Sequence, residues 1–458
     1  MSLKDLLMNL PEVKSPLEKK LSFGTRMKWT LIILVFFFIL SNIPLYGLTQ
    51  NALSRFEYLS IILGASFGSI MSLGIGPIVT ASIVLQLLVG SKLISLDLTT
   101  TEGKKFFQGL QKILAIFFTL FEAGIYVLMR GLQAQPGFEL LLIFQLFLGG
   151  ILVIFMDEII SKWGFGNGVG LFIVGGVAWQ LVTRAFNFIG PGKTLEPIGK
   201  IPVFIVSLIN ADTTGAVAAF AAIVATVVIF IVVVYTQAIK VEVPLSFGRI
   251  RGFGIRWPLN FFYTSNIPVI LAAALHANIQ LLATLAEQVA KHPTFLGSFS
   301  SDGVPLSGLA FWISAPPAGL IEHIVKGSFA PVMLWQSLIY ILFMVSCSVM
   351  FAVFWMKTSG QDAASQAQHI KASGLQVPGF RHDPRIIESV LSRYIMPLTV
   401  MGGAAVGLLA ALADIGGALV RGTGILLSVM IIYRLYEEIA QQHALDMHPI
   451  ARKFISKT

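Results

Sequence analysis

Ten apolar segments, each about as long as a membrane-spanning helix, follow one another along this chain. About 20 consecutive apolar residues cross the hydrocarbon core of a bilayer. Only 12% of the residues are charged, whereas a soluble protein has about 25%. The sequence therefore predicts an all-α polytopic membrane protein whose surface is solvated mainly by lipid. The expected spans are 29–46, 74–91, 108–129, 138–156, 168–184, 215–237, 261–284, 331–355, 395–413 and 422–439.

The Lys and Arg residues between these spans are distributed unevenly. If the N-terminus is cytoplasmic, 24 of the 32 basic residues fall on the cytoplasmic side. Lys and Arg accumulate in the cytoplasmic loops of membrane proteins, so both termini are predicted to be cytoplasmic. This distribution also explains most of the net charge of +9 without a general affinity for nucleic acid.

A polar interruption near the middle of the chain, roughly residues 185–214, divides the spans into two groups of five. We therefore expect an N-terminal half over residues 1–200 and a C-terminal half over residues 201–458. Two halves with an odd number of spans must be inverted relative to each other if they share a fold. Inverted repeats place a site or passage at their interface near the membrane midplane. This inference rests on the span count and not on sequence similarity between the halves.

The second span opens on Gly74-Ile75-Gly76-Pro77, the residue types least compatible with a continuing helix. The apolar segment just upstream, residues 56–68, is too short to cross a bilayer. Non-helical backbone at membrane depth is tolerated only where it is buried in protein or lines a watery cavity. The sequence therefore predicts that this break faces an interior space, either as a movable element or as a fixed re-entrant turn.

Five long motifs occur in order over nearly the whole chain. They are GIGPIVTASIVLQLLVG at 74–90, FQGLQKIL at 107–114, MDEIISKWGFGNGVGLFI at 156–173, SNIPVILAAAL at 265–275 and GTGILLSVMIIYRLYE at 422–437. Together they resemble the SecY family, the central subunit of the Sec protein-translocation channel, and its archaeal branch in particular. The resemblance implies a protein-conducting channel in the cell membrane that translocates unfolded secretory polypeptides and releases transmembrane segments laterally into lipid. It implies no enzymatic activity, no cofactor and no metal.

The resemblance also implies a plug and a pore ring. The plug is a re-entrant helix over about residues 54–66 that fills the outer funnel; its residues include Ser54, Phe56, Leu59, Ile62, Leu63, Gly64 and Ser66. A narrow apolar ring dewets and blocks ions without selecting a particular substrate. The ring positions are Ile75, Val79, Val169, Ile173, Ile270 and Leu427.

Polar side chains inside spans are costly and require a partner. The positions matching Thr80, Glu122 and Asn278 form a polar cluster across the lateral gate of the family, the seam through which a signal sequence reaches lipid. Family members often carry Gln at the position of Glu122. The alternative is that Glu122 only snorkels or pairs structurally. His276 is expected either to join Asn278 or to face the seam.

Two basic cytoplasmic loops, about residues 240–257 and 357–394, match the loops by which the family docks the ribosome. Arg and Lys bind ribosomal RNA through its phosphates. The docking positions are Arg249, Arg251, Arg256 and Arg381. The alternative is that these charges only hold the loops inside. The other implied partners are a SecE-like subunit, a small third subunit, secretory and membrane preproteins with signal sequences, and the lipid bilayer.

Two other classes of protein remain as alternatives. An ion-coupled secondary transporter also uses inverted halves and broken helices, but it requires carboxylates near the midplane, and only Glu122 is placed deep in a span. An intramembrane hydrolase built on Ser66 and His276 is suggested by the G-x-S-x-G pattern at 64–68. That pattern requires a strand, a sharp turn and a helix with a third catalytic group, and the sequence offers none of these there.

Overall fold

The computed structural model describes residues 11–17, 21–51, 65–90, 93–94, 96, 100–129, 131–188, 197–247, 254–264, 267–300, 303–317, 319–372, 375–376, 384–420 and 422–447. The helices are α2 (Phe23–Ser41), α4 (Gly76–Gly90), α5 (Thr101–Leu128), α6 (Glu139–Trp163), α7 (Gly168–Phe186), α8 (Lys200–Ile209), α9 (Thr213–Gln237), α10 (Ile267–Ala290), α11 (Gly308–Trp312), α12 (Leu320–Val325), α13 (Val332–Thr358), α14 (Ala363–Ala372), α15 (Pro384–Ile415) and α16 (Gly422–Met447). The strands are β1 (Leu48–Asn51), β2 (Leu132–Ala134), β3 (Lys240–Phe247), β4 (Gly254–Asn260), β5 (Ser298–Phe299), β6 (Pro305–Ser307) and β7 (Leu375–Gln376).

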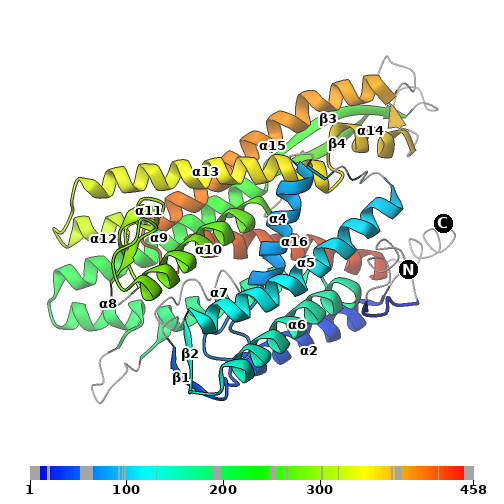
Figure 1. The fold of residues 1–458 in the computed structure, drawn as a ribbon. Helices are drawn as coiled ribbons and strands as arrows, with labels where there is room; N and C mark the ends of the chain where they lie inside the picture. Colours follow the sequence, from blue (N-terminus) through cyan, green and yellow to red (C-terminus); the bar gives the residue numbers. More distant parts are fainter. Residues whose placement is uncertain are drawn as a thin grey trace.

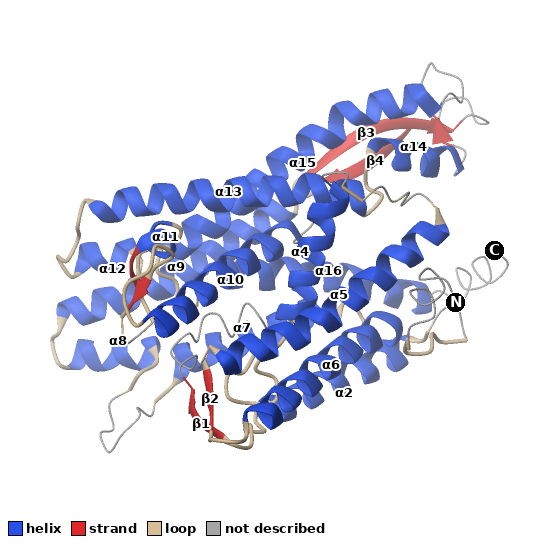
Figure 2. Cartoon of the chain, in the orientation of Figure 1, coloured by secondary structure: helices blue, strands red, loops and turns tan. Residues whose placement is uncertain are grey.

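Each of the ten predicted spans corresponds to one helix, namely α2, α4, α5, α6, α7, α9, α10, α13, α15 and α16. Among the described helices, eight are long and apolar enough to cross a membrane, and α4 is a shorter apolar helix. Figure 1 shows α4, α10 and α16 in the middle of the bundle, between α13 and α15 on one side and α2 and α6 on the other. The strands lie at the two ends of the bundle (Figure 2).

Polar residues at the starts of several apolar runs define where the helices begin. Ser22, Thr100, Asn167 and Asp212 each accept a hydrogen bond from a backbone N–H in the first turn of α2, α5, α7 and α9. These N–H groups have no partner within the helix, so the cap satisfies them. These helix starts are therefore stabilised by contacts that are local in the sequence.

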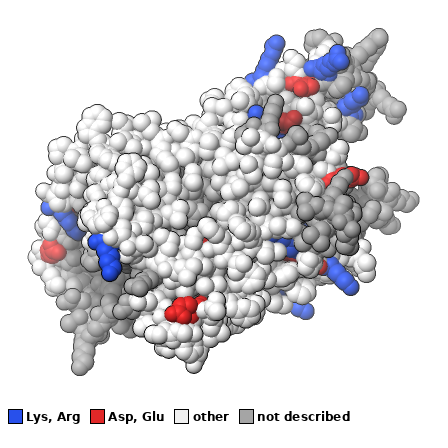
Figure 3. All heavy atoms as spheres, in the orientation of Figure 1, with Lys and Arg blue, Asp and Glu red and all other residues white. Residues whose placement is uncertain are grey.

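The outer surface of the bundle is apolar. Val227, Phe230 and Ile231 on α9 are each more than half exposed, which is the arrangement expected for side chains that face lipid. Charged side chains gather toward the two ends of the molecule, and most of the face between them is uncharged (Figure 3). The fold is that of a polytopic all-α membrane protein.

The polar interruption at 185–214 contains a helix that the sequence analysis did not predict. Helix α8 has ten residues and is about 15 Å long, half of what a bilayer requires. It packs on α9, where the rings of Phe204 and Phe220 stack with their centroids 5.6 Å apart. An apolar helix too short to span was therefore read as part of a loop.

The two segments predicted as cytoplasmic loops, about residues 240–257 and 357–394, also contain regular structure. Strands β3 and β4 form an antiparallel hairpin from the pair Lys240–Asn260 to the pair Ser246–Gly254, and β7 extends this sheet. Helix α15 begins at Pro384 and is about 48 Å long, so its first turns extend beyond a hydrocarbon core of about 30 Å.

The end of the molecule formed by β3, β4, α14 and the first turns of α15 is here called the projecting end. It has a small apolar core of its own. Ile387, Leu391 and Ile395 recur every fourth residue on one face of α15, which is helical periodicity. They pack with Val243 and Leu259 of the hairpin. The apolar face explains why the helix continues outside the predicted span 395–413.

Candidate pore and lateral gate

The six predicted ring residues all lie within the first two turns of four helices or directly before them. They are Ile75 and Val79 at the start of α4, Val169 and Ile173 in α7, Ile270 in α10 and Leu427 in α16. All six belong to or pack against one apolar cluster that joins residues of both halves. Five are at most 6% exposed, and Val169 is partly buried. The fold thus gathers into one cluster six residues that are up to 352 positions apart in the chain, counted from Ile75 to Leu427.

The irregular backbone before α4 is satisfied by its own serines. The Ser66 hydroxyl donates to the carbonyl of Ser41 at 2.9 Å, and the backbone N–H of Gly68 donates to Ser72 Oγ at 2.9 Å. Met71 and Leu73 in this segment are fully buried. Gly68 and Gly74 have φ angles of +93° and +52°, a region that favours glycine. The break at residues 74–77, predicted to face an interior space, lies in a run of buried residues, 71–77, whereas residues 65–68 are partly buried.

Most of the predicted plug lies outside the residues that the structure describes. Ser54, Phe56, Leu59, Ile62, Leu63 and Gly64 lie outside the described residues. Only Ser66 is described, and its hydroxyl is used in the contact with Ser41.

The three predicted gate residues form one hydrogen-bonded chain, here called the gate cluster. Asn278 Nδ2 on α10 donates to Thr80 Oγ1 on α4 at 3.2 Å. The Thr80 hydroxyl in turn donates to Glu122 Oε1 on α5 at 3.0 Å. All three side chains are partly buried. Thr80 is the bridge, because its single hydroxyl acts as both acceptor and donor.

A second polar contact joins α4 to α5 and was not predicted. Gln111 Nε2 donates to Ser82 Oγ at 2.7 Å. Gln111 belongs to the motif at 107–114, and its spacing of 11 residues from Glu122 places it three helical turns earlier on α5. This helical spacing from Glu122 is the sequence feature that could have indicated a second polar contact between α5 and α4.

His276 does not join the gate cluster. Its Nε2 lies 3.1 Å from Gln280 Nε2, and its ring centroid lies 5.7 Å from that of Tyr340 and 6.0 Å from that of Phe343 on α13. Gln280 also donates to the Ser314 hydroxyl. His276 is therefore part of a buried polar group between α10 and α13, and no described contact brings it to Ser66.

The predicted docking residues are mostly outside the described structure. Arg249, Arg251 and Arg381 are among the undescribed residues. Arg256 lies in β4, paired with Pro244 of β3. The projecting end carries other basic side chains that are exposed, namely Lys240, Lys357, Lys371, Arg385 and Arg393.

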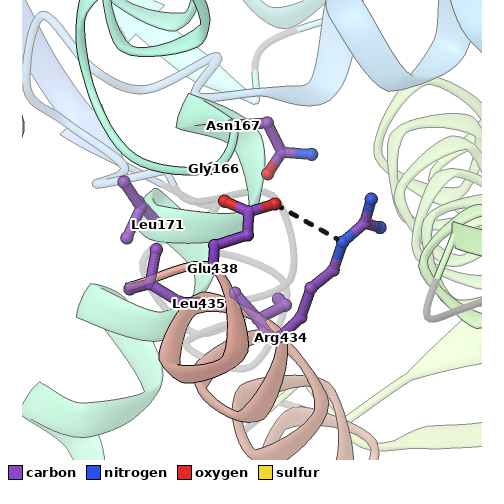
Figure 4. A pocket seen from close by; sticks show the side chains of 7 residues that line it. Gly166, Asn167, Leu171, Arg434, Leu435 and Glu438 are labelled. Carbon is purple, nitrogen blue, oxygen red and sulfur yellow. Dashed lines mark ion pairs between the residues drawn. The ribbon is translucent and has the colours of Figure 1, made fainter. Parts of the chain in front are cut away.

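A pocket of about 170 Å³ lies between the start of α7 and the second half of α16. Figure 4 shows Asn167 and Leu171 of the first segment facing Arg434 and Glu438 of the second. Arg434 Nε and Glu438 Oε1 are 3.9 Å apart. Cofactor sites usually measure 300–1,000 Å³, so this pocket is too small for one. Among the described residues, no group of three His, Cys, Asp or Glu side chains has the geometry of a metal site.

Comparison with known proteins agrees with this arrangement. The SecY family model matches residues 69–436, and the model of the plug domain of Sec61p matches residues 35–68. The protein translocase subunit SecY of Methanothermobacter thermautotrophicus is 46% identical over 97% of this chain and 96% of its own.

Solved structures agree as well. A chain from the structure of a protein-conducting channel has 37% identity and a TM-score of 0.81, covering 98% of this chain and 99% of its own. Sec61 in the canine ribosome–channel complex has 37% identity and a TM-score of 0.78, with the same coverage. These relatives give no support to the transporter alternative. The chain belongs to the SecY family of protein-conducting channels.

Proposed function

We propose that this channel translocates unfolded secretory polypeptides across the cell membrane and releases transmembrane segments laterally into lipid. Family membership supports the channel activity. The observation that carries the finer proposal is the pairing of an apolar cluster at the centre of the bundle with a hydrogen-bonded seam beside it. The first suits a passage that must be closed to ions, and the second suits a wall that opens. No catalytic step is part of this function.

In this proposal the pore ring forms the seal. An ion entering an apolar constriction loses its hydration without gaining a ligand. The burial of the ring residues in a cluster shared by α4, α7, α10 and α16 supports a closed constriction. Aliphatic side chains give way to any peptide because they form no directional bonds.

The gate cluster holds the seam between α10 and the pair α4 and α5. The hydrogen bond from Asn278 to Thr80 crosses this seam, beside an apolar cluster that contains residues of both α5 and α10. In a low-dielectric environment an unsatisfied polar group is costly, so this bond favours the closed wall until a signal helix replaces it.

The plug over residues 54–66 closes the outer side. The match of residues 35–68 to the plug domain of Sec61p supports this role. After replacement of Cys347, a cysteine at Ser54 or Leu59 should change its reactivity toward an impermeant reagent when a preprotein is trapped in transit. Identical labelling with and without the preprotein would indicate a fixed re-entrant turn.

The N- and C-termini are proposed to be cytoplasmic, together with the projecting end. The distribution of Lys and Arg supports this orientation. The start of α2 and the end of α16 also lie at the same end of the bundle as β3, β4 and α14 (Figure 1). Two inverted halves of five spans, over residues 1–200 and 201–458, are compatible with this arrangement.

The projecting end is proposed to dock the ribosome through Arg249, Arg251, Arg256 and Arg381. The likeness to Sec61 in a ribosome–channel complex supports this partner. Replacing Arg381 by Glu, or both Arg249 and Arg251 by Glu, should weaken ribosome binding. The slope of log affinity against log salt concentration should also become less steep, by about 0.9 for each lost phosphate contact. A SecE-like subunit and a small third subunit complete the proposed assembly.

The decisive experiment is transport by purified channel complex in proteoliposomes. A preprotein with a signal sequence should become protected from external protease, and the same preprotein without its signal should not. A parallel assay of solute uptake driven by an ion gradient tests the transporter alternative. Equal protection of both preproteins, or gradient-driven uptake without any protection, would contradict the proposal.

A further inference from the structure

Two buried or partly buried carboxylates, Asp157 and Asp414, are not used by the pore ring or by the gate cluster. Asp157 lies in α6, the span before α7, and Asp414 lies near the end of α15, the span before α16. Each lies one residue beyond the end of a predicted span, 138–156 or 395–413. Each side chain contacts the N-terminus of the next helix, and both of these helices carry ring residues.

Asp157 accepts hydrogen bonds from the first turn of α7. The backbone N–H of Val169 donates to Asp157 Oδ1 at 3.0 Å, and that of Gly168 also donates to this carboxylate. A Cβ at Gly168 would lie 2.6 Å from the Asp157 Cα. Only glycine therefore allows the start of α7 to approach Asp157 this closely.

Asp414 makes the corresponding contacts with α16. The backbone N–H of Thr423 donates to Asp414 Oδ1 at 3.1 Å, and the Thr423 hydroxyl lies 3.3 Å from the same oxygen. Tyr340 on α13 donates its hydroxyl to Asp414 Oδ2. A Cβ at Gly422 would lie 2.0 Å from the Ala413 Cβ, so this approach again requires glycine.

The first turns of the two helices correspond at several positions. A shift of 254 positions, the separation of Gly168 from Gly422, brings Gly170, Ile173 and Val177 of α7 onto Gly424, Leu427 and Ile431 of α16. Thus the ring residues Ile173 and Leu427 are counterparts.

The contacts between the helices obey the same shift. A Cβ at Gly170 would meet Ile431 at 3.3 Å, and a Cβ at Gly424 would meet Val177 at 3.2 Å. Each glycine therefore faces the counterpart of the residue that the other glycine faces. This reciprocity is the mark of a two-fold relation, here between α7 and α16.

We propose that Asp157 and Asp414 are positioning residues that anchor the N-termini of α7 and α16 and so hold Val169, Ile173 and Leu427 in the closed pore ring. The inference rests on the proposed sealing role of the ring. A carboxylate at a helix N-terminus satisfies free N–H groups and interacts favourably with the helix dipole. Each ring residue concerned lies within six residues of its anchored end, so displacement of that end moves the ring residue directly.

The test is the resting ion conductance of the purified channel complex in planar bilayers. Asp157→Ala and Asp414→Ala should each raise the conductance about fivefold, the effect of losing one helix cap. Asp157→Asn and Asp414→Asn keep both the shape and an acceptor oxygen and should retain most of the seal, whereas Asp157→Leu and Asp414→Leu have a similar branched shape but no acceptor and should leak like the Ala variants. A purely steric role predicts a seal in the Leu variants as well. Glu158→Gln is the matched control: Glu158 binds Lys112 and Lys162 and should leave the conductance unchanged.

The outcomes separate this inference from the ring proposal. Folded Ala variants with wild-type conductance, alongside a leaking ring variant, overturn the anchors. If the ring variant does not leak, the ring proposal fails, and amide exchange then decides the anchors: faster exchange at Val169 and Thr423 supports them, and unchanged exchange overturns them. If an Ala variant does not fold, the same exchange measurement on the corresponding Leu variant, which also lacks the acceptor, gives the decision.

Discussion

The pore ring and the gate cluster meet on the same helices but are built from opposite kinds of side chain. Ile75 and Val79 at the start of α4 are almost fully buried among aliphatic residues. Thr80, the very next residue, is partly buried and bonded on both sides. Successive residues of one helix point about 100° apart, so α4 serves the ring with one face and the seam with the next.

The difference between the pore ring and the gate cluster explains how the same helices can seal the pore and still open toward lipid. The ring depends on many weak contacts that fix no partner, and the entry of a peptide replaces them with similar ones. The seam depends on a directional bond, from Asn278 to Thr80, that is either made or broken. The ring should therefore control leakage, and the gate cluster should control the signal that is needed to open the wall.

The largest effect is expected when the ring is made polar. Ile75→Ser combined with Leu427→Ser removes two fully buried aliphatic side chains. Burial of each is worth about 1.5–3 kcal/mol, so the population of the closed state relative to wetted states should fall by at least about a hundredfold. Ion conductance across planar bilayers measures this loss.

A matched control for this variant lies on the lipid face. Val227→Ser with Ile231→Ser changes two exposed residues of α9 and should leave the conductance at the wild-type level. Equal leakage in the two double variants would show that polarity anywhere in the bundle causes the leak. The distinction between ring and surroundings would then be lost.

A smaller effect is expected at the seam. Thr80→Val keeps the side-chain shape but removes the hydroxyl that joins Asn278 to Glu122. Intramembrane hydrogen bonds are worth roughly 1 kcal/mol, so opening should become about fivefold easier. The measurement is insertion across a graded Leu/Ala signal series, in which less hydrophobic signals should now succeed.

Ser82→Ala provides the comparison for Thr80→Val. It breaks the contact with Gln111 between α4 and α5, which does not reach α10. The signal threshold should stay at its wild-type value. A threshold that moves equally in both variants would mean that the general packing of α4, and not the seam bond, sets the gate.

The smallest effect is expected for Glu122→Gln. The amide oxygen of Gln can accept the Thr80 hydroxyl as Glu122 Oε1 does. The threshold should therefore change by less than about twofold, a few tenths of a kcal/mol. Glu122→Leu removes the acceptor, and comparing it with Glu122→Gln separates the hydrogen bond from the charge. A large shift in the Gln variant would contradict a role limited to accepting this bond.

Much of the fold could be predicted from the chain because its signals are local. An apolar run of about 20 residues becomes a spanning helix whatever its neighbours are, and caps such as Asn167 fix helix starts within one turn. The predictions failed where a helix was short, as in α8, or where it continued into the polar end, as in α15. In both, packing against another element adds the stability that the local pattern does not show.

The candidate site divides in the same way. The ring residues were selected by resemblance, because an aliphatic residue in an apolar span carries no signal of its own. The gate residues were also marked by their polarity within apolar spans. The structure brought the six ring residues into one cluster and joined Asn278 to Thr80 across 198 positions. In the structure His276 lies beside Gln280 and Tyr340 and not in the gate cluster.

The sequence by itself determined that the chain lies in a membrane, how many spans it has and on which side its positive charges gather. Each of these properties depends on the transfer of single residues or short segments between water and lipid. Only the tertiary structure decided which helix ends meet at the constriction and that Asp157 and Asp414 reach the starts of α7 and α16. Those contacts depend on how whole helices cross. The glycines at 168 and 422 were visible in the sequence, but what they approach was settled by packing.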